Sequence, residues 1–153
     1  MRKFWSTLAI AGAMAAFAGS GTAAEKTVVL GVSDALSGGG AVYGVPQKRA
    51  IDLAIEEINS AGGFIVGNDT IRFDTIAYDD KADPTEATNV ARKLIDRDGV
   101  KFLLGYCCSA STGAVASFIG REDVIMLVGT AGARAITAAG NKNVFRTRPP
   151  GDY

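Results

Sequence analysis

The chain has 153 residues, of which 48% are hydrophobic and 21% are charged, a composition typical of one globular domain rather than a disordered or fibrous chain. Its 16 basic and 16 acidic side chains cancel, so it has no electrostatic footprint for nucleic acid or an anionic membrane surface. Histidine is absent, which excludes a Ser-His-Asp triad, a Cys-His pair and a histidine metal site within this chain.

Residues 1–24 have the pattern of a secretory signal peptide. Arg2 and Lys3 precede an apolar stretch over 4–17, and small residues follow up to Ala24. A membrane-spanning helix needs about 20 predominantly apolar residues, and this stretch is shorter. We therefore expect export to the periplasm, cleavage after Ala24 and a mature domain over residues 25–153.

The first half of the mature part predicts a strand, a helix and a second strand. A β-branched run over 27–32 is suited to a strand that is buried on both faces. From Pro46 onward, apolar residues recur at helical spacing until Gly62-Gly63, which supply a helix stop. A second strand is expected over 71–78.

The second half continues the alternation. Asp83-Pro84 with Glu86 forms a capping-box pattern that predicts a helix start. The further elements expected are a strand over 101–104, a helix over 111–119, a strand over 124–128, a short helix over 133–138 and a strand at 144–145. Strands separated by helices indicate βαβ units, so the predicted fold class is α/β with a doubly wound parallel sheet.

Ligands of such sheets bind beyond the carboxyl ends of the strands, which directs attention to three strand-to-helix loops. The first, 37–44, is rich in glycine, but its spacing departs from the G-x-G-x-x-G dinucleotide pattern. The second, 106–113, and the third, 129–133, place hydroxyl groups and free backbone N–H groups at helix N-termini, which suits a carboxylate. Each hydroxyl could instead only cap its own helix, but two such loops at one sheet edge favour a shared ligand site.

A set of short motifs carries a resemblance to a known family. The motifs, in chain order, are Leu36-Ser37-Gly38 with Tyr43-Gly44, Ile55 to Gly63, Tyr78-Asp79-Asp80 with Asp83-Pro84, Gly105 to Thr112, and Val144 to Thr147. In this order the sequence resembles the periplasmic leucine/isoleucine/valine-binding proteins over essentially the whole mature chain. The resemblance implies the N-terminal lobe of a type I periplasmic binding protein, an ABC importer's solute receptor and not an enzyme. It implies an amino acid as ligand, a permease as partner, and no cofactor or catalytic residue.

The resemblance also implies a set of ligand-binding residues. They are Tyr43, Ser109, Ala110, Ser111, Thr130 and Gly132. Ser109 and its neighbouring N–H groups would bind the α-carboxylate, and Tyr43 would wall the side-chain pocket or simply pack. Gly132 stands where the family has a threonine, so that contact is lost or is made by Thr130 or the backbone.

The cysteines are a second departure from the family. Its members often have a disulfide from the turn before the second helix to the position of Cys108, but Ala82 replaces that partner here. Three states of Cys107 and Cys108 are open: buried reduced thiols, which we favour, a strained vicinal disulfide, or a bridge to a cysteine elsewhere.

Two other functions are compatible with this fold class. They are a Rossmann-type nucleotide-dependent oxidoreductase and a ligand-sensing receptor domain of the amide or urea type. The departure from the G-x-G-x-x-G spacing argues against the oxidoreductase. The predicted export signal argues against the oxidoreductase and against the receptor domain. A type I binding site lies between two lobes, so we also expect the chain to be a truncated lobe that binds weakly or not at all by itself.

Overall fold

A computed structural model describes residues 24–151. The predicted signal peptide lies outside the described residues, apart from Ala24. Within the described range, no helix combines the length and the apolar character needed to span a bilayer.

Six strands form one sheet in the order β2-β3-β1-β4-β5-β6. The strands are β1 (Glu25–Asp34), β2 (Phe64–Val66), β3 (Asp69–Asp79), β4 (Phe102–Gly105), β5 (Ile125–Val128) and β6 (Val144–Arg146). All neighbouring pairs are parallel except the β2–β3 hairpin. This confirms the α/β class and each of the five predicted strands.

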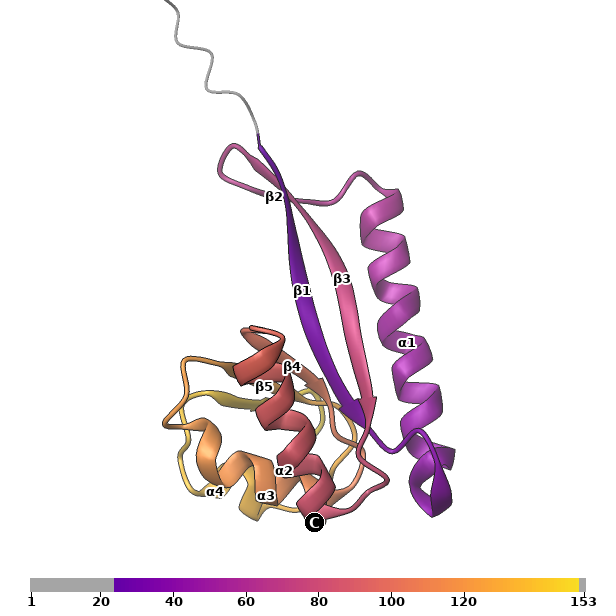
Figure 1. The fold of residues 1–153 in the computed structure, drawn as a ribbon, viewed down its shortest axis with the longest axis vertical. Coiled ribbons are helices and arrows are strands. Elements are labelled where there is room, and N and C mark those ends of the chain that lie inside the picture. Colours follow the sequence, from indigo (N-terminus) through magenta and orange to yellow (C-terminus); the bar gives the residue numbers. More distant parts are fainter. Residues whose placement is uncertain (1–23, 152–153) are drawn as a thin grey trace, which may run out of the picture.

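Helices cover the two faces of the sheet unequally. They are α1 (Ala41–Ser60), α2 (Pro84–Arg92), α3 (Ser109–Ile119) and α4 (Ala135–Ala138), with a 3-10 turn, η1 (Gly38–Gly40), and a π-helical turn, η2 (Lys93–Arg97), beside them. Figure 1 shows α2, α3 and α4 together against one part of the sheet, while α1 runs alone along β1 and β3. β1 pairs with β3 over its whole length but with β4 only at residues 31–33, so the amino-terminal halves of β1 and β3 project as a ribbon.

The core lies between the sheet and the α2–α3 layer. Leu94, Leu103, Val115, Ile119 and Met126 are fully buried there. The pattern of α2 explains its position, because the side chain of Asp83 caps the helix by accepting from the Glu86 N–H at 2.8 Å, and its apolar stripe faces the sheet.

Four elements differ from the prediction. The strand β2 was not expected, α3 begins at Ser109 rather than Ser111, and α4 begins at Ala135 rather than at residue 133. The helix α1 begins at Ala41, five residues before Pro46, which lies inside it. Gly44 makes this start possible, because a Cβ at that position would lie 2.1 Å from the carbonyl oxygen of Ala35.

Candidate functional site

Three strand-to-helix loops meet at the carboxyl edge of β1, β4 and β5. β1 leads through η1 into α1, β4 leads into α3, and β5 leads toward α4. Tyr106 N donates to Ser33 O at 2.9 Å and Gly129 N donates to Gly105 O at 2.9 Å, so the three loops begin side by side. The sequence-based expectation that the loops share one sheet edge is therefore confirmed.

Two aspartates fix the first of these loops. Asp34 is fully buried at the end of β1, where its Oδ1 accepts from the N–H groups of Ala35 at 3.1 Å and Cys107 at 3.0 Å. Asp79 ends β3 and accepts from the N–H of Leu36 at 2.8 Å and from the Ser37 hydroxyl at 2.5 Å. Asp34 thus connects the end of β1 to the loop before α3, and Asp79 connects the glycine-rich loop to the end of β3.

The environments of these carboxyl groups shift their pKa values in opposite directions. Burial raises the pKa of Asp34 to about 6, against the hydrogen bonds from Cys107 and Ala35. Partial burial also acts to raise the pKa of Asp79, but the hydrogen bonds from Ser37, Lys81 and Leu36 outweigh it and lower that pKa. Burial also raises the pKa of Asp80, whose Oδ2 accepts from the Ser33 hydroxyl at 2.9 Å. Asp79 is therefore ionised well below neutral pH, whereas Asp34 becomes mostly ionised only as the pH rises above about 6.

The N-terminus of α3 holds three of the predicted ligand residues. Helix geometry leaves the N–H groups of Ser109, Ala110 and Ser111 without an acceptor inside the helix, because the first intrahelical bond runs from Thr112 N to Cys108 O at 3.0 Å. Ala110 is exposed and Ser109 is partly exposed. Ser111 is buried, and its hydroxyl donates to Cys108 O at 2.9 Å, so only its backbone N–H is left for a ligand.

The hydroxyl group of Ser109 joins the second and third loops. Its Oγ accepts from the N–H of Ala133 at 3.1 Å. Because Oγ is the acceptor in that bond, the hydroxyl proton is free to be donated to an anion, together with the N–H groups of the helix N-terminus. The second and third loops are therefore joined by a hydrogen bond and form one continuous edge of the candidate site.

Thr130 is held by a residue that the sequence analysis missed. Its hydroxyl donates to Gln47 Oε1 at 2.7 Å, and the Gln47 amide nitrogen is buried without a partner among the described atoms. Gln47 stands on the stripe of α1 that continues through Ile51, Ile55 and Ile58. A polar residue on an apolar stripe is a sequence signal that could have found it.

The two other predicted residues lie in different surroundings. Gly132 is partly exposed, and its carbonyl accepts from Gly151 N at 2.9 Å. Tyr43 is 64% exposed in the first turns of α1. No hydrogen bond among the described residues joins Tyr43 to the other predicted residues, and its role as a pocket wall stays a prediction.

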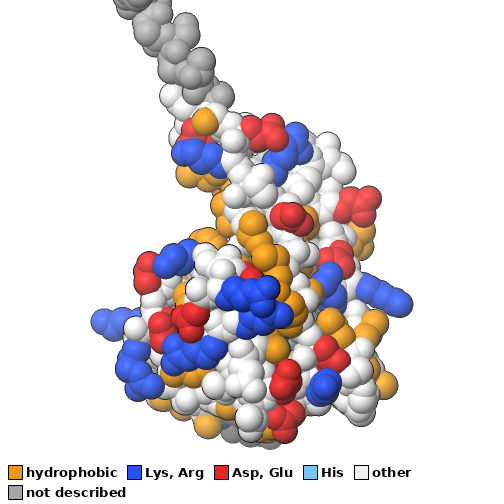
Figure 2. Space-filling model, in the orientation of Figure 1, with side chains coloured by type: hydrophobic (Ala, Val, Ile, Leu, Met, Phe, Trp, Pro, Cys, Tyr) orange, Lys and Arg blue, Asp and Glu red, His pale blue; other side chains and the backbone are white. Residues whose placement is uncertain are grey.

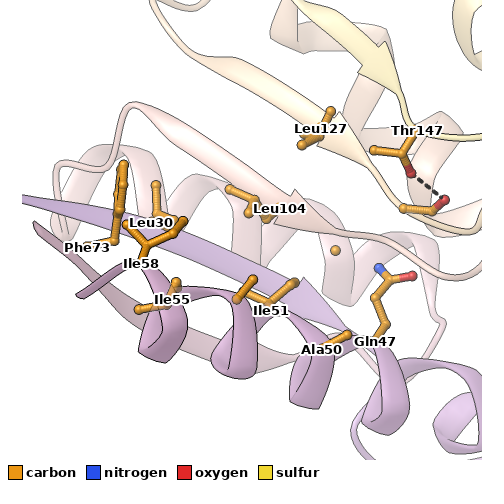
Figure 3. A pocket seen from close by; sticks show the side chains of 13 residues that line it. Leu30, Gln47, Ala50, Ile51, Ile55, Ile58, Phe73, Leu104, Leu127 and Thr147 are labelled. Carbon is orange, nitrogen blue, oxygen red and sulfur yellow. Dashed lines mark hydrogen bonds between the residues drawn. The ribbon is translucent and has the colours of Figure 1, made fainter. Parts of the chain in front are cut away.

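A cavity of about 370 Å³ lies between α1 and the sheet, next to Gln47. Figure 3 shows Ile51, Ile55 and Ile58 of α1 facing Leu104 and Leu127 across it. Its polar end is made by Gln47 and by Thr147, whose hydroxyl donates to Gly129 O at 3.1 Å. The cavity is thus apolar along its length and polar only where it reaches the loops.

Hydrophobic side chains remain exposed on the face of the sheet that carries this cavity. Phe102, Ile125, Leu127 and Phe145 are each between 38% and 51% exposed. In the space-filling view, hydrophobic side chains reach the surface in a band between the β1–β3 ribbon and the part that carries α2 to α4 (Figure 2). α1 therefore covers only part of its face of the sheet.

The two cysteines lie at the start of the second loop. Both are free thiols and both are half-buried, with their Sγ atoms 2.9 Å apart. Within the described residues, no group of three or more Cys, Asp or Glu side chains is arranged to hold a metal ion.

Comparison with solved structures defines the class of protein. An isoleucine complex of the branched-chain amino acid transporter substrate-binding protein LivJ from Streptococcus pneumoniae superposes with a TM-score of 0.72 and 26% identity, over 82% of this chain and 34% of that one. A solute-binding protein of an ABC transporter from R. palustris, in complex with 4-hydroxybenzoate, superposes with a TM-score of 0.68 and 26% identity. That match covers 82% of this chain and 32% of the other. The fold is that of part of a lobe of a type I periplasmic binding protein.

Sequence comparison identifies the family. A family model described as periplasmic binding protein matches residues 27–152. The leucine-, isoleucine-, valine-, threonine- and alanine-binding protein of Pseudomonas aeruginosa is 38% identical over 96% of this chain, and the Leu/Ile/Val-binding protein of Escherichia coli strain K12 is 34% identical over 86%. The chain belongs to the periplasmic binding protein family. It spans 37% and 35% of the lengths of these two relatives.

Proposed function

We propose that the protein is the extracytoplasmic solute-binding component of an ABC importer and that it binds a branched-chain or related amino acid. The observation that carries this proposal is the joint between the two hydroxyl-bearing loops, made by the hydrogen bond from Ala133 N to Ser109 Oγ. This joint sits beside three N–H groups at the N-terminus of an 11-residue helix. Such a group of donors suits the α-carboxylate of an amino acid.

The apolar cavity supports the side-chain part of the proposal less directly. The cavity reaches the loops at Gln47, Gly129 and Thr147, and a ligand bound there would contact the described residues on one side. Sites for small ligands bury about 70–90% of the ligand surface. We therefore expect weak binding by this chain alone and tighter binding by a longer gene product that supplies a second lobe.

The role of Ser109 is testable with a matched control on the same helix. Ser109→Ala removes the hydroxyl at the joint, whereas Ser117→Ala removes an exposed hydroxyl that only bonds Ala114 O, eight residues further along α3. A hydrogen bond to a charged group contributes about 1.5–3 kcal/mol, so Ser109→Ala should weaken the affinity by roughly tenfold to a hundredfold. Ser117→Ala should leave it unchanged.

The measurement is isothermal titration calorimetry of the chain and of any longer gene product against isoleucine, leucine, valine, alanine and 4-hydroxybenzoate, with a separate titration against NAD. Binding of an aliphatic amino acid that Ser109→Ala weakens supports the proposal. Binding of 4-hydroxybenzoate alone would keep the solute-binding role but replace the ligand class. Binding of NAD and of none of these solutes would favour the oxidoreductase alternative.

A further inference from the structure

Cys107 and Cys108 form a pair of thiols that the proposed ligand site does not use. Their Sγ atoms are 2.9 Å apart, and both side chains are half-buried and free. The separation exceeds the about 2.05 Å of a disulfide bond by less than 1 Å, so little movement separates the two states.

The surrounding structure holds the pair at a fixed place. Asp34 Oδ1 accepts from the Cys107 N–H at 3.0 Å, and the preceding residue, Tyr106, has a positive φ of 62°. On the other side, Cys108 caps α3, because its carbonyl oxygen accepts from the Thr112 N–H at 3.0 Å and the Thr112 hydroxyl at 2.7 Å. The backbone on both sides of the dithiol is therefore restrained, which brings the two sulfur atoms together.

We propose that Cys107 and Cys108 are a reversible dithiol–disulfide site, oxidised by a low-molecular-weight disulfide. One thiolate attacks a sulfur of the small disulfide, which forms a mixed disulfide and releases one small thiolate. The second cysteine then attacks the bound protein sulfur, its proton passes to the departing small thiolate, and the Cys107–Cys108 bond forms. The protein loses two hydrogens, and the small disulfide is reduced to two thiols.

The order of attack follows from the environment of the two sulfurs. Burial, the contact with Cys108 and the nearby Asp34 raise the pKa of the Cys107 thiol well above its usual range. A thiol with a raised pKa is the poorer first nucleophile. Cys108 therefore makes the first attack, and Cys107 closes the bond.

Reversibility follows from chain geometry. Disulfide-bonded cysteines usually have Cα atoms about 4.4–6.8 Å apart, whereas neighbouring Cα atoms are only about 3.8 Å apart across a trans peptide bond. The closed ring is therefore strained, and strained disulfides are easily reduced.

The test needs no ligand, so its failure leaves the proposed function untouched. The purified chain is equilibrated with oxidised glutathione, alkylated with iodoacetamide, digested with trypsin and analysed by mass spectrometry without reduction. The tryptic peptide 102–121 contains both cysteines. We expect this peptide to lose two hydrogens and to take up no iodoacetamide, and to regain two reactive thiols after treatment with dithiothreitol.

Two variants and the wild-type peptide discriminate between the outcomes. Cys107→Ser leaves Cys108, the first nucleophile, and should carry glutathione where the wild type carries the internal bond. Cys108→Ser leaves only Cys107, whose raised pKa makes it the poorer nucleophile, and should carry less glutathione after the same time. A wild-type peptide that stays doubly alkylated, carries glutathione or is linked to a second chain would overturn the proposal. Because the wild-type peptide alone decides this, a variant that fails to fold does not affect the result.

Discussion

The buried carboxyl group of Asp34 should make the stability of this lobe depend on pH. The residue is fully buried, its Oδ1 accepts two backbone N–H groups, and its Oδ2 has no hydrogen-bond partner among the described atoms. Burial raises its pKa from 3.8 to about 6. The isosteric variant Asp34→Asn keeps an acceptor for the two N–H groups and removes the titration.

The sign of the effect follows from proton binding. Between pH 3.8 and about 6 the folded state holds more protons at Asp34 than the unfolded state does. The free energy of unfolding therefore falls as the pH rises through this window and stays lower above it. One pKa unit corresponds to about 1.4 kcal/mol, so the loss amounts to about 3 kcal/mol at most.

The assay is urea unfolding followed by far-ultraviolet circular dichroism, at several values between about pH 4 and pH 7, for both proteins. We expect the free energy of unfolding of the wild type, minus that of Asp34→Asn, to fall by up to about 3 kcal/mol across this range. Asp80, which also has a raised pKa, is present in both proteins, so the subtraction largely removes its contribution. A difference that does not change with pH would refute the reasoning.

Two further substitutions test the geometry around the site. Gly105 has φ +113°, and a Cβ there would lie 2.4 Å from a β1 carbonyl oxygen, so Gly105→Ala should destabilise the fold by about 3 kcal/mol or more in urea unfolding. Gly113→Ala, in an open helical position, should be neutral or stabilise by about 0.5–1 kcal/mol, and equal effects of the two would contradict the model. Ala82 and Cys108 both border Gly40, and the family resemblance implies a disulfide between these two positions, so Ala82→Cys should form a disulfide with Cys108; peptide mapping that finds both thiols free would contradict this.

The sequence predicted those elements whose residues carry a strong local signal. The helix α2 was expected from Asp83-Pro84 and Glu86, and the cap is present. The strand β1 was expected from its β-branched run, but the expected burial on both faces holds only at its carboxyl end, since residues 25–27 are exposed and 28–30 are half-buried. The stop of α1 was expected at Gly62-Gly63, where both glycines have positive φ values.

The elements that were missed have weak or misleading local signals in the sequence. The strand β2 has only three residues, all exposed, which is too short to show a period of two. The start of α1 depends on the close approach of Gly44 to the backbone of Ala35, nine residues earlier. A proline such as Pro46 favours the first helical position, so local preference pointed to the wrong start.

The candidate site was predictable in its location but not in its internal contacts. The rule that ligands bind beyond the carboxyl ends of parallel strands led to the loops of Ser109 and Thr130. The bond between Thr130 and Gln47 joins residues 83 positions apart, and no pattern in the sequence pairs them. The inward turn of the Ser111 hydroxyl was also invisible, because a serine three residues into a helix can point either way.

Asp34 links the stability of the lobe to the shape of its binding edge. A buried carboxyl group with an elevated pKa costs stability at neutral pH, and an apolar residue of similar size would avoid that cost. Such a residue would leave the N–H groups of Ala35 and Cys107 without an acceptor at the points where the first and second loops begin. The loops would then lose the restraint that sets their positions relative to each other. The carboxyl group of Asp34 therefore lowers the free energy of unfolding at neutral pH, but it fixes the positions of the loops that carry Ser109 and its neighbours.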